Sequence, residues 1–189
     1  MIPSLRETAA GLYGAFRLLR GDPDGLAYFD ASDEGFWKSF FAAVLTAPGY
    51  LAFAYFDPRP MSADAGRFVL VEAITFVILW TAFPLAMHHV TRLIDRADRY
   101  RLHIVAYNWS QVIQTAIAAP LLLGTRDGTL VSEPAANLIA LAVMLAMGLY
   151  EWFIARSALK LPGFGALAIV MLSVFLVLIM SDVSYMLLR

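Results

Sequence analysis

Residues 161–188 read LPGFGALAIVMLSVFLVLIMSDVSYMLL, and Asp182 is the only formally charged side chain among them. A helix needs about 20 mainly apolar residues to cross roughly 30 Å of hydrocarbon, so this run is long enough to do so. Soluble domains do not carry apolar runs of this length. The stretch therefore predicts a transmembrane helix and places the chain among integral membrane proteins.

Four more stretches have the same character. They cover residues 39–56, 68–90, 102–123 and 134–155. Glu72 and Glu151 are the only formally charged side chains in them. Turns that contain proline or glycine, which do not continue a helix well, are predicted at residues 57–60, 125–128 and 161–163. Connections this short favour antiparallel neighbours, so we expect an all-α integral membrane protein with five transmembrane helices.

Composition excludes several classes of function. Hydrophobic residues make up 60% of the chain, charged residues 15%, and the net charge is −1, so no positive field attracts nucleic acid. The absence of cysteine excludes disulfides and thiolate chemistry. His88 and His89 are adjacent and point about 100° apart on a helix, so they lack the spacing of a metal pair. We expect no catalytic residue, no metal site and no cofactor.

Basic residues predict the orientation, because cytoplasmic loops carry more of them. Four lie on one side of the predicted membrane: Arg59, Arg67, Arg126 and Arg189. Ten lie on the other: Arg6, Arg17, Arg20, Lys38, Arg92, Arg96, Arg99, Arg101, Arg156 and Lys160. This predicts a cytoplasmic N-terminus and an external C-terminus. Arginine outnumbers lysine 12 to 2, which points to a bacterial source and so to an inner membrane.

Residues 1–35 are expected to form a cytoplasmic segment ahead of a transmembrane domain at residues 36–189. Its apolar positions fall close to one face of a helix: Leu5, Leu12, Phe16 and Leu19. The arginines of this segment project elsewhere, so residues 3–19 predict an amphipathic helix on the cytoplasmic leaflet. A helix packed under the bundle is the alternative, and the sequence leaves both open.

A polar layer is predicted near the cytoplasmic ends of three spans. Its members are His88, Asn108, Gln111, Gln114 and Glu151. One interpretation is a cavity open to the cytoplasm in which Glu151 and a histidine exchange protons or bind a ligand. The other is a set of interhelical hydrogen bonds, each worth on the order of 0.6 to 2 kcal/mol. In either case we expect Glu151 to face the third span or an inward cavity, since an unsatisfied carboxyl in lipid is costly.

Two further groups of charges have simpler interpretations. Glu72 and Asp182 lie near the outer ends of their spans, where we expect both to reach headgroup water, with pairing to Arg67 or Arg126 as the alternative. The run at residues 92–101 holds four arginines that are candidate contacts for anionic lipid headgroups: Arg92, Arg96, Arg99 and Arg101. The alternative is that this run only sets the topology.

Residues 101–110 read RLHIVAYNWS and lead toward Pro120. This stretch resembles the third span of the YIP-domain family of small five-span membrane proteins, and the whole layout from residue 36 onward is similar to theirs. The resemblance implies five crowded helices behind a cytoplasmic N-terminal segment. The aspartate-leucine-tyrosine-glycine-proline motif of the eukaryotic trafficking members is missing, so the resemblance does not extend to a role in vesicle traffic.

These observations lead to one functional hypothesis and two alternatives. The hypothesis is a non-enzymatic inner-membrane protein with a scaffold or accessory role that binds lipid, another membrane protein or a second copy of itself. The first alternative is a small transporter or channel that uses the polar layer around Glu151, His88, Asn108 and Gln111. The second is an intramembrane enzyme, which bound metal in the purified protein would favour. Nucleic acid is not an expected partner.

The predicted topology is testable with reporter fusions. Fusions near Asp64 and Gly128 should report an external location, and a fusion near Asp98 a cytoplasmic one, because the basic residues gather on the side of Asp98. External labelling of a position near Asp98 in intact cells would contradict the topology.

Overall fold

The computed structural model describes residues 2–56, 62–125 and 131–189, and over these residues the chain is helical and contains no strand. The predicted all-α class is therefore confirmed. The elements are α1 (Leu5–Leu19), η1 (Pro23–Tyr28), α2 (Asp33–Ser39), α3 (Phe41–Tyr55), α4 (Ala65–Leu93), η2 (Ala97–Arg99), α5 (Tyr100–Gly124), α6 (Glu133–Leu159) and α7 (Gly163–Leu188). Each of the five apolar runs coincides with a long helix, α3 to α7. The predicted turn at residues 161–163 lies between α6 and α7, whereas residues 57–60 and 126–128 lie outside the described residues.

Three of these helices are long and apolar enough to cross a membrane. They are α4, α6 and α7, with 29, 27 and 26 residues. α3 has 15 residues, fewer than the roughly 20 that a straight crossing needs. α5 has 25 residues but includes the amides of Asn108, Gln111 and Gln114, which reduce its apolar character. Three candidate spanning helices are thus established within the described part of the chain.

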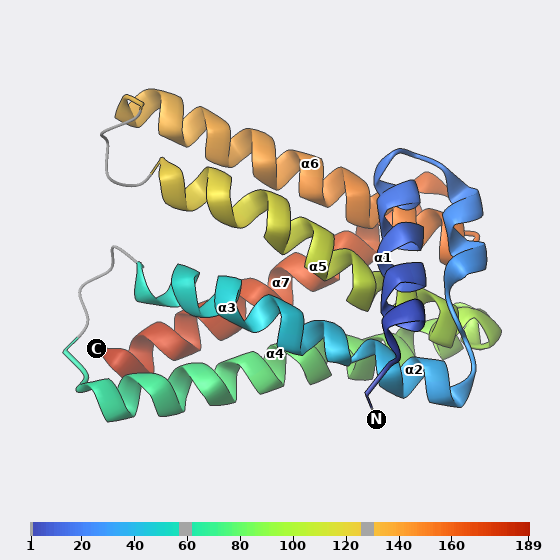
Figure 1. Ribbon diagram of the computed structural model, residues 1–189, viewed down its shortest axis with the longest axis horizontal. Helices are drawn as coiled ribbons and strands as arrows, with labels where there is room; N and C mark the ends of the chain where they lie inside the picture. Colours follow the sequence, from blue (N-terminus) through green and yellow to red (C-terminus); the bar gives the residue numbers. More distant parts are fainter. Residues whose placement is uncertain (1, 57–61, 126–130) are drawn as a thin grey trace.

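The five long helices run side by side, and α1 crosses them at one end of the molecule (Figure 1). α3 packs on α5, α5 on α6, α6 on α7 and α7 on α4. Toward the other end, α5 and α6 diverge from α4 and α7 (Figure 1). There the backbone N–H groups of Ser62 and Ala63 donate to the carbonyl of Leu188 at 3.1 Å, so the start of α4 is joined to the end of α7. We call the two ends the α1 end and the far end.

Hydrogen bonds at its first turn fix where α1 begins. The Glu7 backbone N–H donates to Ser4 Oγ at 3.2 Å, and the Ser4 backbone N–H donates to Glu7 Oε2 at 2.6 Å. This reciprocal pair is a capping box, which satisfies donors that the helix itself leaves free. Because Ser4 is the N-cap and Leu5 is the first helical residue, the helix starts slightly later than the predicted residue 3.

A lysine on α2 ties α1 to the rest of the molecule. Lys38 Nζ lies 2.7 Å from Glu7 Oε1 and 2.6 Å from Glu34 Oε1. The hydrogen bond from Lys38, together with those from Ser4, lowers the pKa of Glu7 to about 2. A carboxylate with a lowered pKa stabilises the folded state above its ordinary pKa, and this contribution disappears as the pH falls toward 2. At neutral pH the ion pair therefore favours the docked position of α1.

The face of α1 that packs on the bundle matches the predicted apolar face only in part: Leu12 and Leu19 pack against the core, whereas Leu5 and Phe16 do not. Gly11, Ala15 and Leu18 are buried, whereas Leu5 is 90% exposed. Small side chains let the α1 backbone lie directly on the ring of Trp109, so they replace the larger apolar residues at this contact. Tyr150 OH of α6 adds a hydrogen bond to the carbonyl of Ala15 at 2.6 Å. α1 therefore packs against α5 and α6 through Gly11, Ala15 and Leu18, with Leu12 and Leu19 partly buried against the same core, while Leu5 and Phe16 face outward.

Gly11 allows a test of this packing. A Cβ at position 11 would come within 2.6 Å of the Trp109 ring, whereas one at Gly148 of α6 would meet no atom within 4 Å. Gly11→Ala should destabilise the protein by roughly 1 to 3 kcal/mol, as overpacking does. Gly148→Ala should be neutral or stabilising by up to about 1 kcal/mol, because it removes a helical glycine. Unfolding temperatures in detergent measure both, and equal values for the two variants would contradict the close contact.

Candidate functional site

Glu151 of α6 is surrounded by three hydrogen-bond donors from two other helices. Ser173 Oγ of α7 donates to Glu151 Oε2 at 2.7 Å. On α5, Gln111 Nε2 lies 3.2 Å and Gln114 Nε2 lies 3.5 Å from Glu151 Oε1. Residues three apart on a helix share a face, which brings both amides to the same oxygen. The expectation that Glu151 faces the third apolar run is confirmed, and this carboxyl links α5, α6 and α7.

Asn108 belongs to the predicted polar layer but lies away from Glu151. Its Nδ2 donates to Ser39 Oγ of α2 at 2.9 Å, and its Oδ1 has no hydrogen-bond partner among the described residues. A stripe with a spacing of three residues turns by about 60° at each step, since a helix rotates about 100° per residue. That rotation carries Asn108 from the α6 side of α5 to the α2 side.

His88 is also separate from the carboxyl of Glu151. Its ring lies edge-on to Tyr100, with centroids 5.4 Å apart, and equally far from the ring of His89. α4 packs mainly against α7, so a side chain at its α1 end does not approach Glu151 on α6. The structure therefore brings together Glu151, Gln111 and Gln114 from the predicted layer, while His88 and Asn108 are elsewhere.

Glu72 of α4 is buried, which corrects the expectation that it reaches headgroup water. Its side chain is 6% exposed, and its two oxygens accept hydrogen bonds of 2.6 Å from Tyr50 OH and from Ser184 Oγ. Phe76 lies one turn further on the same face, and this face points into the bundle. Asp182, by contrast, is exposed as expected. The alternative partner Arg126 lies outside the described residues.

Ser173 and Ser184 are the two α7 residues that bind these carboxyl groups. They lie eleven residues apart, which is about three turns and about 16 Å along the helix, so both project from one face. Both are 5% exposed. Sequence reasoning missed them, although two serines on one face of a mainly apolar helix were a visible signal. Tyr50 was missed too, and no sequence pattern connected it with Glu72.

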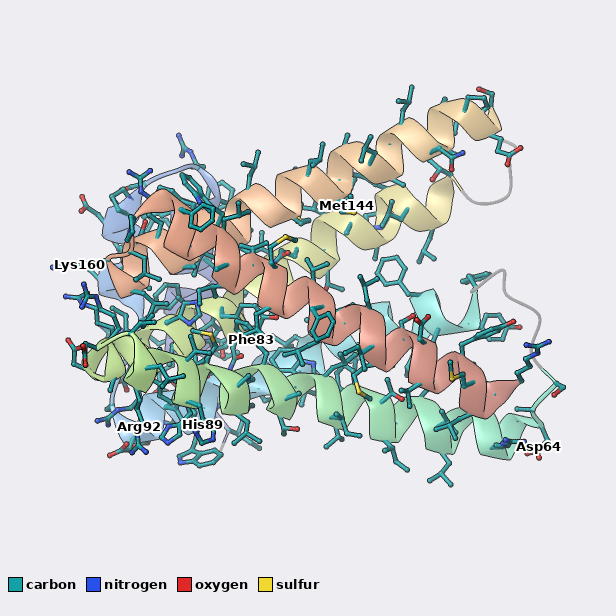
Figure 2. All side chains as sticks on the ribbon, turned by 180° about the vertical axis from the view of Figure 1, so that it is seen from behind. Asp64, Phe83, His89, Arg92, Met144 and Lys160 are labelled. Atoms are coloured by element: carbon teal, nitrogen blue, oxygen red, sulfur yellow. The ribbon has the colours of Figure 1, made fainter. Side chains whose placement is uncertain are left out.

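A cavity of about 250 Å³ lies between α3, α4, α5 and α7, and we call it the central cavity. Tyr50, which binds Glu72, is part of its wall, as are Gln111 and Ser173, which bind Glu151. Phe83, also in the wall, marks its position near the middle of the bundle in Figure 2. The remaining lining residues are Thr46, Phe53, Phe76, Leu79, Trp80, Tyr107, Thr115, Leu176 and Val177. The central cavity is therefore mostly aromatic and aliphatic, with the buried carboxyl group of Glu72 and the partly buried carboxyl group of Glu151 behind its wall.

A second hollow, which we call the α6–α7 groove, has a volume of about 560 Å³ and is almost wholly apolar. Its lining residues are Met144, Leu145, Gly148, Leu149, Trp152, Gly163, Phe164, Leu167, Val170, Met171 and Val174. Figure 2 labels Met144, one of these residues, on α6. At the α1 end of the groove, Trp152 Nε1 donates to the carbonyl of Gly163 at 2.8 Å. The Arg156 guanidinium lies 5.1 Å from the centre of the Trp152 ring, and Lys160 is exposed one turn beyond.

Two of the four candidate headgroup arginines bind the end of α6. Arg96 Nε donates to the carbonyl of Leu159 at 3.1 Å, and Arg99 donates through one of its terminal nitrogens to the carbonyl of Ala158 at 3.2 Å. The last carbonyls of a helix lack partners within the helix and carry partial negative charge, so basic groups stabilise them. These two arginines therefore hold the connection between α4 and α5 against α6.

The other two arginines of the run differ from each other. Arg101 lies 2.6 Å from Asp33 Oδ1 of α2, whereas Arg92 is exposed. Together with Arg156 and Lys160, Arg92 leaves the α1 end with exposed positive charge. The arginine run thus has a clear structural role at three of its four positions.

Comparison with family models, with curated proteins and with solved structures found no match for this chain. Its function is therefore inferred from the two hollows and from the charged groups around them.

Substitution of Glu151 tests whether its hydrogen bonds hold the helices together. Glu151→Gln keeps an acceptor oxygen, so the protein should stay folded with a small loss of stability. Glu151→Leu leaves the amide of Gln111 without its acceptor and should lower the free energy of unfolding by about 1 to 3 kcal/mol. Asp182→Leu removes an exposed acid and is the control. Thermal unfolding in detergent measures all three, and equal unfolding temperatures for the Glu151→Gln and Glu151→Leu proteins would show that the donors do not depend on this carboxyl.

Proposed function

We propose that this chain is a five-span protein of a bacterial inner membrane, with its N-terminus in the cytoplasm and its C-terminus outside. In this arrangement the α1 end faces the cytoplasm, and α3 and α5 cross with α4, α6 and α7. The excess of basic residues at the α1 end supports this orientation. The resemblance to the YIP-domain family also stays a prediction.

The position of α1 supports its assignment as an interfacial helix. It crosses the bundle at the level of Trp109 and Tyr150, and tryptophan and tyrosine gather at the headgroup level of membranes. Two of its larger apolar side chains remain exposed, Leu5 at 90% and Phe16 at 46%. A helix that lies across the spans and keeps an outward apolar face fits the boundary between headgroups and acyl chains.

Within this membrane we propose that the protein binds anionic phospholipid and acts without catalysing a reaction, as a scaffold or accessory protein. The observation that carries the proposal is the α6–α7 groove with exposed positive charge at its α1 end. Its walls are side chains that face lipid in any case, and a hollow among them accommodates an acyl chain. Leu149 and Phe164 are 65% and 85% exposed, so they are free to contact that chain.

The basic residues at the end of the groove select the headgroup. Arg156 and Lys160 lie on the last turn of α6, where a phosphate would be level with the cytoplasmic headgroups. Each basic residue close to an anionic membrane surface contributes about 1 kcal/mol to the attraction. Charge therefore favours binding of the anionic phosphatidylglycerol over that of phosphatidylcholine, which has no net charge. It also favours this lipid over a helix of another protein, unless that helix carries acidic residues at the same depth.

A small transporter or channel built on the polar layer is the alternative. Glu151 with its two glutamine donors favours it, but His88 and Asn108 take no part in that cluster. The three neutral donors around Glu151 also meet the needs of a carboxyl between helices without any transported species. The surface of the α6–α7 groove, in contrast, is not covered by another part of the described chain, so we prefer the lipid-binding function.

Lipid retention tests the proposal. The full chain is placed in bilayers of equal phosphatidylglycerol and phosphatidylcholine, extracted gently, and analysed by native mass spectrometry. The wild type should retain phosphatidylglycerol in preference. Gly148→Phe, which fills the open side of the groove, and the double change Arg156→Gln with Lys160→Asn should each reduce that preference on the order of tenfold, equivalent to about 1.4 kcal/mol.

Two matched variants control for effects unrelated to the groove. Ala146→Phe adds the same ring at an exposed position of α6 outside the groove, and Arg67→Gln removes an exposed arginine at the far end. Both should retain lipid as the wild type does. Equal retention of the two lipids by the wild type, or an undiminished preference in the Gly148→Phe protein, would rule out this lipid site. A helix of another protein found in the groove would replace lipid with a protein partner.

A further inference from the structure

The central cavity lies between two carboxyl groups that have no basic partner. Glu72 is bound by Tyr50 and Ser184, and Glu151 by Ser173 and two glutamines, so every donor recorded for them is a hydroxyl or an amide. In the described part of the chain no lysine, arginine or histidine forms an ion pair with either. A carboxylate removed from water is costly unless it is protonated or a positive charge lies near it. The interior thus has room for a positive charge that the chain itself does not supply.

The wall of the central cavity has the chemistry that attracts such a charge. Phe76, Trp80 and Phe83 follow one another on the inward face of α4, and Tyr50 and Tyr107 approach from α3 and α5. The negative faces of aromatic rings attract cations, and the attraction grows to about 2 kcal/mol where water is excluded. Aromatic rings around a hollow, with carboxyl groups behind them, are typical of sites for substituted ammonium ions.

We propose that the central cavity binds a small organic cation, an amine or quaternary ammonium ion with an apolar body. The charged group lies among the rings of α3, α4 and α5, and the carboxyl groups of Glu72 and Glu151 balance it through the hydroxyl and amide groups of the wall. The apolar body contacts Leu79, Leu176 and Val177.

The size of the cavity limits the ligand. A volume of about 250 Å³ equals the share of about eight water molecules in the liquid, at about 30 Å³ each. That space suits an ammonium ion with several carbon atoms and is too small for a phospholipid. A divalent metal ion needs a closely spaced set of ligands, and no group of three or more histidine, aspartate or glutamate side chains in the described residues provides one. The site is therefore distinct from the α6–α7 groove.

Calorimetric titration of the purified full chain in detergent tests the site with defined probes. Choline and benzyltrimethylammonium carry the charge, and 3,3-dimethylbutan-1-ol is the neutral analogue of choline. Both cations should bind saturably, and the alcohol at least tenfold more weakly than choline. Glu72→Gln and Glu151→Gln should each weaken the binding of both cations about tenfold while leaving that of the alcohol unchanged.

Other variants separate this site from general effects. Phe76→Leu removes one ring from the wall and leaves both carboxyl groups in place. It should also weaken the binding of both cations severalfold. This variant keeps the test valid if a glutamate variant fails to fold. Asp182→Asn, an exposed acid on α7, and Gly148→Phe in the α6–α7 groove should leave choline binding unchanged. Because Gly148→Phe alters only the α6–α7 groove, the cation-binding proposal and the lipid-binding proposal can fail independently of each other.

Several results would overturn the proposal. One is the absence of saturable binding of either cation to protein that unfolds at the normal temperature. Another is equal affinity for choline and the alcohol, which would show an apolar hollow without selectivity for charge. A third is unchanged choline binding in both glutamate variants. In a last experiment, millimolar sodium chloride is added to the choline complex. If it displaces choline, and an equal concentration of a salt with a bulky cation does not, the cavity binds an inorganic ion instead.

Discussion

A polar side chain inside an apolar bundle must find its partners within the protein, and the arrangement of α3 to α7 depends on that requirement. Glu151 connects α6 to α5 and α7, and Glu72 connects α4 to α3 and α7. Both carboxyl groups take a serine of α7 as one donor, so α7 is fixed at two depths along a single face. The aliphatic contacts between these helices are interchangeable with contacts to lipid and do not select one packing. The two carboxyl groups, with their specific donors, do select it.

The sequence was sufficient for the helices and for one of these two junctions. The run 102–123 became α5 (Tyr100–Gly124), because a mainly apolar run of this length between predicted turns favours a single helix. The contact of Glu151 with Gln111 followed from depth alone, since consecutive antiparallel spans place residues near the same end at the same level. Glu72 could not be predicted this way. Its position in the sequence placed Glu72 near the outer end of the span. Its burial, however, depends on the direction of the α4 face that carries Glu72 and Phe76. Contacts of α4 with α3 and α7 set that direction, and the sequence does not show them.

At the α1 end, the charges could be predicted from the sequence but their partners could not. Arg96 and Arg99 look like a surface cluster in the sequence, yet each binds a terminal carbonyl of α6, more than fifty residues away. The same holds in part for α1: of the four apolar residues that suggested its packed face, Leu12 and Leu19 pack against the core, whereas Leu5 and Phe16 do not. Gly11 and Ala15 lie at the contact itself, because the flat ring of Trp109 requires a close approach of the backbone. Helical periodicity weighs residues by hydrophobicity, so it underrates glycine and alanine at contacts where small size is what counts.

The two hollows share α7 as a wall, and this explains why its sequence shows so little pattern. Ser173, Leu176 and Val177 line the central cavity, while Val170, Met171 and Val174 line the α6–α7 groove. Both faces are apolar: one lines the central cavity, and the other lines the groove that we propose binds an acyl chain. A helix that is apolar on all sides gives no moment from which its rotation is predicted. Ser173 and Ser184 mark the inward side, because each donates a hydrogen bond to a carboxyl group of another helix. The Asp182 side chain of the same helix is exposed. In α7, therefore, two small polar side chains carry the information that hydrophobic periodicity carries in a soluble helix.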